Sequence, residues 1–209
     1  MPADERLHSL AAERNRQPIL EVLQRVLPVR GRALEIASGT GQHVVHFAAG
    51  LRSWTWQPTD PDPGARASIA AWTAMCGLPN ILAPLDLDVA ASPWPLTFPE
   101  VDAIFCANML HISPWACCAA LMRGAARHLS SQGLLMTYGP YIVSDVLTAP
   151  SNVAFDADLR LRNPQWGVRR LDAVAQEAVA AGLALRETVS MPANNLLLVF
   201  GRRAEAVAN

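Results

Sequence analysis

The pattern of apolar and polar positions changes its period along the chain and so marks the predicted secondary structure. Val101–Ala107 is apolar at every position except Asp102, as expected of a strand that is covered on both faces. Segments with apolar residues three or four positions apart predict helices. Strands are expected at Arg32–Ala37, Trp54–Thr59, Asn80–Leu87, Val101–Ala107, Gly133–Tyr138, Leu183–Val189 and Leu196–Phe200. Helices are expected at about Ala3–Asn15, Pro18–Leu27, Gln42–Leu51, Pro63–Cys76, Ser113–Leu129 and Arg170–Gly182.

The order of these elements predicts the fold class. Strands and helices alternate until two strands follow one another, which predicts parallel strands joined by right-handed crossovers with helices on both faces. The connection Met191–Asn195 is too short for a crossover, so the last strand must run antiparallel. We therefore expect an α/β fold with a doubly wound, Rossmann-like sheet of seven strands, mostly parallel with the last strand antiparallel. Class I S-adenosylmethionine (SAM)-dependent methyltransferases use a sheet of this kind.

One domain is expected over residues 1–209, because no internal repeat or low-complexity segment divides the chain. In this interpretation residues 1–30 form an N-terminal helical cap. Residues 139–167 show little periodicity, and a loop of that length within a domain is usually a lid or disordered. The aromatic residues Tyr141, Phe155 and Trp166 favour a lid insertion over a solvated linker.

Composition and charge argue against several kinds of partner. Apolar residues make up 51% and charged residues 17%, which excludes a disordered chain or a coiled coil. The net charge is −1, so the basic excess of a nucleic-acid or membrane-surface binder is lacking, and neither partner is expected. The polar start Met1–Arg6 does not resemble a secretory leader, and the four cysteines lack paired spacing. These features predict a cytoplasmic protein with reduced cysteines.

A cluster of small residues follows the first predicted strand, in Glu35–Gly41. Glycines at a strand-to-helix turn let a ligand approach the backbone, and the start of the helix directs N–H groups toward it. The spacing lacks the third glycine of a dinucleotide site and is closer to a SAM-binding turn. A tight turn without a ligand would also explain the glycines. The predicted cofactor-binding residues here are Glu35, Ala37, Ser38, Gly39 and Gly41.

Acidic residues end the next two predicted strands. Asp60 is placed to accept hydrogen bonds from ribose hydroxyls, whereas Asp62 is expected to cap the following helix. The third strand ends in residues suited to the amino group and ring of an adenine: Asp86 or Asp88, with Leu87 or Val89 against the ring. Because ligands of such sheets bind outside the carboxyl ends of the strands, these residues together predict a nucleoside site.

Strands four and five bring further polar residues to the same edge. Asn108 is expected to bond the methionyl part of the cofactor, and Met109 to pack against adenine. His111 is a candidate general base, with a loop histidine bonded to backbone as the alternative. Tyr138 and Tyr141 are candidates for orienting a substrate, or for covering the core.

Several motifs resemble the methyltransferase-like protein 26 family, and together they cover nearly the whole chain. They are Ala12–Asn15 with Pro18–Leu20, Ala37–His43, Trp56–Asp60, Asn108–Pro114, Tyr138–Tyr141, Ser151–Asn152 with Phe155–Asp156, Asn163–Gly167 and Met191–Asn195. The last four are specific to that family. Thr59 departs from the serine expected there. The family is classed as SAM-dependent methyltransferase-like, and its substrates are largely unassigned.

This resemblance implies SAM as cofactor and S-adenosylhomocysteine as product, and it favours Asp88 over Asp86. It also implies that Arg14 and Asn15 close over the site, with Arg14 pairing with a carboxylate, although Arg14 would equally suit a solvated helix end. The residues it implies for substrate binding are Asn152, Phe155, Asp156, Trp166, Asn194 and Asn195.

The function predicted from these features is SAM-dependent methyl transfer to an O, N or S atom of a small, partly apolar metabolite. The methyl donor is already activated, so no metal is expected, and the main catalytic contribution is orientation of the two reactants. His43 and His46 share a helix face without a third ligand, in keeping with packing. Two alternatives stay open: a SAM-fold enzyme that catalyses another reaction with SAM as structural cofactor, and a non-catalytic binding protein. The low surface charge is compatible with a homodimer.

Overall fold

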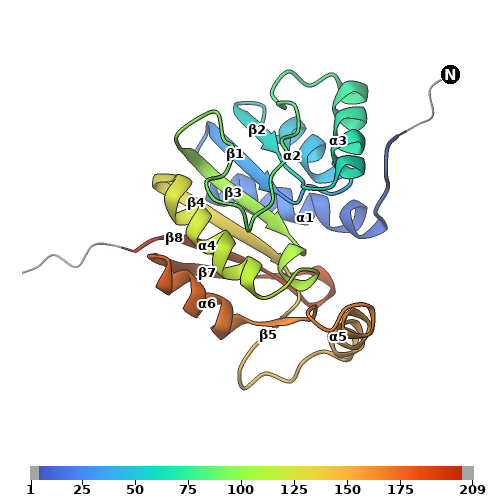
Figure 1. Ribbon diagram of the computed structural model, residues 1–209, viewed down its shortest axis with the longest axis vertical. Helices are drawn as coiled ribbons and strands as arrows, with labels where there is room; N and C mark the ends of the chain where they lie inside the picture. The colour runs from blue at the N-terminus through green and yellow to red at the C-terminus, as the bar shows by residue number, and fades with distance from the viewer. Residues whose placement is uncertain (1–4, 204–209) are drawn as a thin grey trace, which may run out of the picture.

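The computed structural model describes residues 5–203 and has three layers, with helices on both faces of one sheet (Figure 1). The strands of the sheet are β1 (Gly31–Ile36), β2 (Trp54–Pro58), β3 (Val101–Ala107), β4 (Leu129–Gly139), β7 (Leu183–Met191) and β8 (Asn195–Arg202). The helices are α1 (Leu10–Val26), α2 (Gln42–Gly50), α3 (Pro63–Cys76), α4 (Ala116–His128), α5 (Pro150–Arg162) and α6 (Leu171–Ala180). Two short 3-10 helices, η1 (Met109–His111) and η2 (Pro192–Asn194), follow β3 and β7.

The strand order is β2-β1-β3-β4-β8-β7, and β8 runs antiparallel to both of its neighbours. This confirms the mixed, doubly wound sheet with a reversed last strand. The expectation of seven strands is wrong, because the sheet formed by the described residues has six. Residues 80–87 form only isolated bridges, from Ile81 to Trp56 and from Leu85 to Thr59. Pro84 lies between the two bridges and lacks the N–H that a continuous ladder requires.

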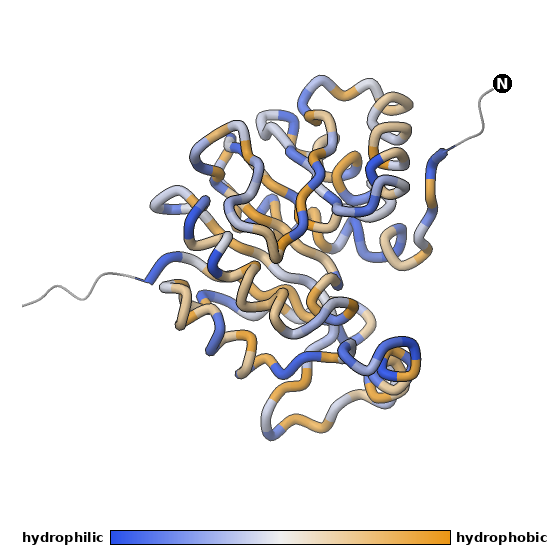
Figure 2. Tube along the Cα trace, viewed as in Figure 1, coloured by the Kyte–Doolittle hydropathy of each residue, from blue (hydrophilic) through white to orange (hydrophobic). Residues whose placement is uncertain are grey.

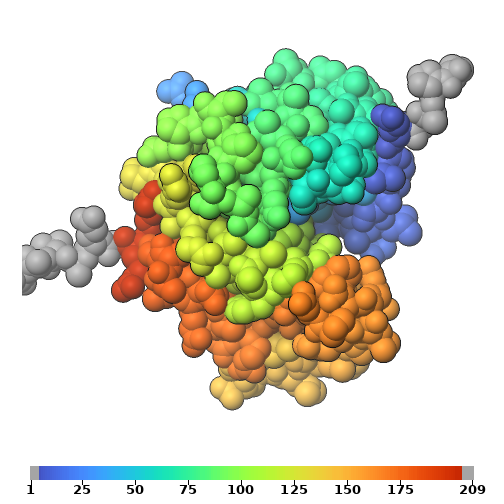
Figure 3. Space-filling view, viewed as in Figure 1, coloured from blue at the N-terminus to red at the C-terminus, as the bar shows by residue number. Residues whose placement is uncertain are grey.

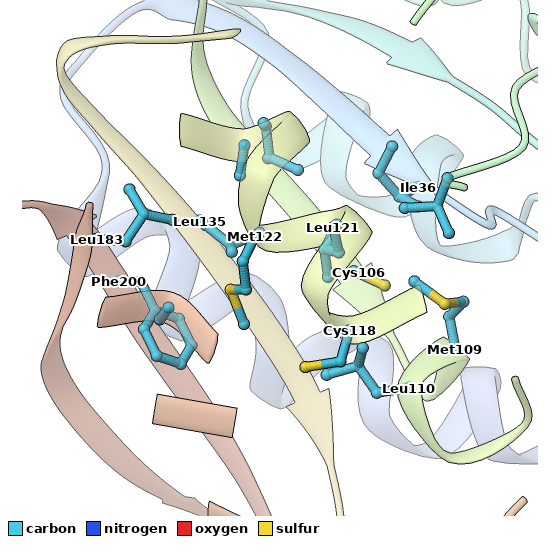
Figure 4. Close-up of a cluster of buried hydrophobic side chains, with 14 of the residues drawn as sticks. Ile36, Cys106, Met109, Leu110, Cys118, Leu121, Met122, Leu135, Leu183 and Phe200 are labelled. Atoms are coloured by element: carbon cyan, nitrogen blue, oxygen red, sulfur yellow. The ribbon is translucent and has the colours of Figure 1, made fainter. Parts of the chain in front are cut away.

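Alternate residues of the central strands supply two separate cores, one on each face of the sheet. In β3, Ile104 and Cys106 face the layer of α4 and α6, whereas Ala103 and Phe105 face the layer of α1 and α2. Figure 4 shows side chains of α4 packed against strand residues in the first of these cores. Figure 2 shows apolar segments along the strands and on the helices beside them, and buried residues from both supply the cores on the two faces of the sheet.

The N-terminal cap contains one long helix within the described residues, not the two that we expected from the sequence. Helix α1 runs from Leu10 to Val26 through Pro18, and the side chain of Ser9 caps it by accepting a hydrogen bond from Ala12 N at 3.2 Å. Residues 3 and 4 of the first predicted helix lie outside the described residues. Proline deprives the helix of one N–H donor. Packing of the buried residues Ile19 and Leu23, which follow Pro18 in the helix, offsets the loss.

Residues 139–167 are more regular than a loop. They contain α5 and the two-residue strand β5 (Tyr141–Ile142), which pairs in parallel with β6 (Arg169–Arg170). In Figure 1 this segment projects beyond the carboxyl end of β4. Our expectation of a loop there was wrong for residues 150–162, because α5 forms although it buries only Asn152 and Leu159 and so lacks the apolar stripe by which a helix is recognised in a sequence. Within residues 5–203, no helix has both the length and the apolar character needed to cross a bilayer.

Substitution of Pro18 tests whether α1 is continuous. Alanine restores the missing N–H in mid-helix, so we expect Pro18→Ala to raise the free energy of unfolding by about 2 kcal/mol in urea denaturation. Pro28, which lies beyond the helix and is exposed, serves as the control. Pro28→Ala should instead be neutral or slightly destabilising, because it only adds freedom to the unfolded chain. Equal effects of the two substitutions would contradict a helix that runs through Pro18.

Candidate functional site

The turn after β1 has a backbone that few residues adopt. Ala37, Gly39 and Gly41 all have left-handed conformations, with φ of 53°, 56° and 86°. Glycine is required at position 41, because a Cβ atom there would lie 2.8 Å from the Cα atom of Ile69 in α3. The turn therefore packs directly on α3. Every second residue from 37 to 41 is left-handed, and this keeps the backbone of the turn close to the edge of the sheet.

Asp60 joins this turn to the end of β2. Its Oδ2 atom accepts a hydrogen bond from Gly39 N at 2.9 Å, and its Oδ1 atom accepts one from Asp62 N at 3.0 Å. Asp60 is only 8% exposed. Each carboxylate oxygen can accept more than one hydrogen bond, so both can still bind a ligand's hydroxyl groups. Asp62 caps α3 by accepting a hydrogen bond from Ala65 N at 2.7 Å, as the sequence predicts.

A pocket of about 300 Å³, here called the nucleoside pocket, opens beside Asp60. It brings together six predicted cofactor-binding residues: Ala37, Gly39, Asp60, Leu87, Asp88 and Met109. Its other lining residues are Ile36, Pro61, Val89, Ala107, Ile112, Ser113 and Cys117. Apart from Val89, the sequence analysis did not select these, although most of them directly adjoin selected residues or strand ends. The lining is mainly apolar with two carboxylates at the edge, an arrangement suited to an apolar ring that carries polar groups.

The two acids of residues 86–88 have different surroundings. Asp88 lines the nucleoside pocket, and its carboxylate accepts a hydrogen bond from Ala90 N at 2.9 Å. Asp86 is not among the lining residues; its side chain is 70% exposed and pairs with Arg66 at 3.2 Å. The structure therefore places Asp88, and not Asp86, where a ligand in this pocket would meet it.

Glu35 and Ser38 lie beneath the turn and support it. The Ser38 hydroxyl donates to Glu35 O at 3.2 Å and accepts from Thr59 N at 3.1 Å, which ties the ends of β1 and β2 together. The Glu35 side chain is buried, and its Oε2 atom has no hydrogen-bond partner among the described residues. Burial raises the pKa of Glu35 to about 8, against a hydrogen bond from Ser38 that lowers it. Glu35 is therefore neutral at pH 7, and neither residue lines the nucleoside pocket.

His111 is enclosed by the end of β4. It has no exposed surface, and neither ring nitrogen has a hydrogen-bond partner within residues 5–203. Its ring packs edge-on against Tyr141, with centroids 5.1 Å apart, and a Cβ atom at Gly139 would overlap it. Burial lowers the pKa of His111 to about 3. A general base needs an accessible nitrogen, and this placement does not offer one.

The two predicted tyrosines and Asn108 lie around the same strand ends. Tyr141 is buried and its hydroxyl donates to Thr137 Oγ1 at 2.9 Å, and burial raises the pKa of this phenol. Tyr138 is also buried, and burial likewise raises its pKa, against a hydrogen bond with Asn15. Asn108 directly follows β3, before η1, in a left-handed conformation with φ of 59°. Both phenols are therefore neutral at pH 7 and are potential hydrogen-bond donors.

Helix α1 reaches this edge through Asn15. The Oδ1 atom of Asn15 lies 2.7 Å from His43 Nε2, and burial lowers the pKa of His43 to about 4. His43 stacks on Phe47, so it packs in the core beside Asn15. Arg14 is exposed on the same helix.

Among residues 5–203, no group of three or more His, Cys, Asp or Glu side chains could hold a metal ion.

A second pocket, of about 390 Å³, lies between the start of α5 and the β7–β8 connection, and we call it the α5 pocket. It brings together four predicted site residues: Tyr141, Asn152, Asn194 and Asn195. Asn152 Nδ2 donates to Asn194 O at 2.9 Å, and Asn194 Nδ2 donates to Ser151 Oγ at 3.2 Å. These amides join α5 to η2. Apolar side chains also line the pocket, among them Val143, Val146 and Leu147.

Phe155, Asp156 and Trp166 are absent from the lining of this pocket. Asp156 accepts hydrogen bonds from Val168 N at 2.7 Å and from Arg160 Nε at 2.8 Å. Because a Cβ atom at Gly167 would lie 2.7 Å from Asp156 Oδ1, this carboxylate fixes the turn after α5. Trp166 lies near the Arg162 guanidinium, at 5.3 Å. The structure thus gives Asp156 an internal role and leaves Phe155 on the surface, 36% exposed.

Comparison with known proteins gives one family and many structures of the same fold. The model of a family described as "Protein of unknown function (DUF938)" matches residues 6–202. The mitomycin 7-O-methyltransferase MmcR is 15% identical over 92% of this chain and 54% of its own, with a TM-score of 0.78.

Two other similar structures contain a cofactor or its product. CalO1, a methyltransferase of calicheamicin biosynthesis in its SAH-bound form, is 15% identical over 90% of this chain and 54% of its own, with a TM-score of 0.73. NcsB1, an O-methyltransferase of neocarzinostatin biosynthesis in complex with SAM and a naphthoic acid, is 16% identical, with a TM-score of 0.74. That match covers 92% of this chain and 55% of NcsB1. The chain therefore has the Rossmann-like methyltransferase fold and spans about half the length of these structures.

The buried carboxyl group of Glu35 predicts a pH-dependent stability. Its pKa rises from 4.5 in the unfolded chain to about 8 in the fold, so the folded state binds this proton more tightly. Glu35 therefore destabilises the fold increasingly as the pH rises from 4.5 to 8, and it has no such effect below that range. The isosteric Glu35→Gln variant should gain stability relative to the wild type over that interval, by on the order of a few kcal/mol.

Urea denaturation at several pH values measures this difference. Glu21→Gln, at an exposed position on α1, is the matched control and should differ from the wild type by a constant amount. A Glu35→Gln difference that is also independent of pH would show that this carboxyl group ionises normally in the fold.

Proposed function

The chain belongs to the DUF938 family, and we propose that it is a SAM-dependent methyltransferase whose acceptor is an O, N or S atom of a small, partly apolar metabolite. Oxygen is the first choice among these atoms, because the similar structures described above include three methyltransferases, two of them named as O-methyltransferases. The methyltransferase-like protein 26 resemblance supports the same reaction and is proposed as the closer relationship within this fold.

The observation that carries this proposal is the nucleoside pocket. A strained glycine turn and a buried carboxylate meet at the carboxyl ends of β1 and β2, where ligands of doubly wound sheets bind. We propose that Asp60 accepts hydrogen bonds from the ribose hydroxyls and that Asp88 accepts one from the adenine amino group. The apolar residues Leu87 and Met109 would hold the ring between them.

Residues at the carboxyl ends of β3 and β4, together with α1, would hold the methionyl end of SAM. Asn108, Asn15 and Tyr138 lie at that end of the strands, and Arg14 is exposed nearby on α1. A protonated phenol and an amide are donors for a carboxylate, and a guanidinium pairs with one directly. We propose that Arg14, Asn15, Asn108 and Tyr138 hold the charged end of the cofactor, whose sulfonium supplies an activated methyl group.

The α5 pocket is our proposed acceptor site. Its lining combines the amides of Asn152, Asn194 and Asn195 with aliphatic side chains, so it suits a molecule that has both polar groups and apolar surface. Two of the motifs that resemble the methyltransferase-like protein 26 family, Ser151–Asn152 and Met191–Asn195, contribute to this region.

The chain's own contribution to the reaction would be mainly orientation and exclusion of water. His111 is a positioning residue in this mechanism, because its neutral ring packs against Gly139 and Tyr141 and so fixes the end of β4. Proton removal by His111 would require the ring to become exposed. An acceptor that is already deprotonated at neutral pH needs no base from the protein.

Two other functions use the same fold. A SAM-fold enzyme that catalyses a different reaction would bind SAM in the nucleoside pocket without transferring the methyl group of SAM. A binding protein would not convert any cofactor. A cytoplasmic location and a homodimer remain part of the proposal.

Cofactor binding is tested by a matched pair of carboxylates. Asp60→Asn should weaken S-adenosylhomocysteine binding by about tenfold to a hundredfold, because a charge-assisted bond to a ribose hydroxyl is lost. Asp86→Asn should bind as the wild type does, because Asp86 faces Arg66 and solvent. Isothermal titration calorimetry measures both. Absence of binding to the wild-type protein at millimolar ligand would overturn the proposed function.

Methyl transfer is tested with methyl-labelled SAM and an extract of small metabolites. We expect the label to appear in a compound of low mass. The Asn152→Ala variant removes one amide from the proposed acceptor site, so it should reduce the yield of labelled product severalfold while the affinity for the cofactor is kept. Val153→Ala, an exposed neighbour on α5 outside the pocket lining, is the control and should leave the yield unchanged. Bound cofactor without any labelled product would favour the non-methylating alternative.

A further inference from the structure

We propose that a third pocket, separate from the two described above, binds a phosphate group. It lies between residues 89–94 and α4, has a volume of about 220 Å³, and is called here the arginine pocket. It is lined by Val89, Ala90, Ala91, Ser92, Pro93, Trp94, Ala120, Arg123, Gly124, Arg127 and His128. In Figure 3 the green segment before β3 and the yellow-green α4 lie side by side on the visible face.

The charges in this pocket are all of one sign. Arg123 and Arg127 are one helical turn apart on α4, and the lining contains no acidic residue. In the part of the chain that the structure describes, neither guanidinium has a carboxylate within salt-bridge distance. Like charges at this spacing repel each other on a helix, so an anion between them would relieve the repulsion. Arg127 and His128 also suit the negative end of the helix, but Arg123 lies before its last turn.

The floor of the pocket is preformed by an aromatic pair. Trp94 is 5% exposed and packs on Gly124, where a Cβ atom would overlap the indole. The His128 ring stacks on Trp94, with centroids 5.4 Å apart and planes at 10°. Its Nδ1 atom is buried without a hydrogen-bond partner among the described residues. Because this nitrogen is buried, the donors that a ligand in the pocket meets are the two guanidinium groups, and the indole needs no rearrangement to accept that ligand.

Size and donor geometry select the ligand. The pocket is smaller than the roughly 300 Å³ at which sites for drug-sized molecules begin, so it suits a single charged group and not a whole nucleotide. Two guanidinium forks match the several oxygens of a phosphate better than they match the two of a carboxylate. The ligand class is therefore a phosphate group, whether free phosphate or the end of a small phosphomonoester.

The arginine pocket and the nucleoside pocket share a wall. Val89 lines both of them, and Asp88 of the nucleoside pocket bonds Ala90 N of the arginine pocket at 2.9 Å. A phosphate that orders residues 89–94 would therefore also order Asp88 and favour cofactor binding. This regulatory consequence rests on the proposed function, whereas phosphate binding itself does not.

The site is tested by titrating the ligand-free protein with inorganic phosphate at constant ionic strength, followed by ¹H–¹⁵N NMR. We expect saturable shifts of the Trp94 indole N–H and of the amides of residues 89–94. Arg123→Gln and Arg127→Gln should each weaken binding by about tenfold. Arg52→Gln, at an exposed arginine outside this pocket, should change nothing. Shifts that are non-saturable, or equal in all three variants, would reflect general charge screening and overturn the site.

Glycerol 3-phosphate in the same titration separates the two sources: binding at least as tight as that of phosphate identifies a phosphomonoester site, and weaker binding identifies free phosphate.

The coupling is tested by calorimetry of S-adenosylhomocysteine with and without saturating phosphate. We expect about fivefold tighter cofactor binding with phosphate present, and no such gain in Arg123→Gln. Equal affinities in the wild type would overturn the coupling. Failure of the cofactor to bind in either condition would overturn the proposed function, while the NMR titration would still decide the phosphate site.

Discussion

The candidate site depends on the contact between the carboxylate of Asp60 and the backbone of Gly39. It joins the ends of two neighbouring strands and holds a turn in which alternate residues are left-handed. Glycine adopts this conformation without strain, whereas Ala37 adopts it at a cost, and the hydrogen bond to Asp60 and the packing of Gly41 on α3 hold the turn in place. The nucleoside pocket lies directly beside this contact, and its shape follows from it.

Around this turn the structure buries polar groups in their neutral forms. Glu35, His111 and Tyr141 are all enclosed, and burial moves the pKa of each toward its uncharged state. A rigid, uncharged layer beneath the strand ends costs stability but fixes the edge on which ligands would bind. The side chains of Asp60 and Asp88 instead line the pocket itself. This separation of the buried neutral groups from the carboxyl groups at the pocket fits a site that works by orienting its ligands more than by proton transfer.

The sequence analysis was most successful where the signal is local. The apolar run of β3, the glycine turn and the Asp62 cap are encoded within a few residues, and the structure contains each of them. It failed where distant contacts override local signals. Residues 80–87 have strand-like composition, but Pro84 limits them to isolated bridges. Pro18 suggested a break between helices, yet packing of Ile19 and Leu23 keeps α1 continuous.

The sequence alone therefore determined the alternation of strands and helices, the reversed last strand and the glycine turn, because periodicity and short connections restrict the backbone directly. Tertiary structure decided which candidates meet. Asp88 and Asp86 are two residues apart, yet only Asp88 lines the nucleoside pocket. His111 was a candidate general base from its place after the fourth predicted strand, but β4 and Tyr141 enclose it. The exposure and the direction of a side chain depend on neighbours that are distant in sequence, so no local sequence pattern predicts either of them.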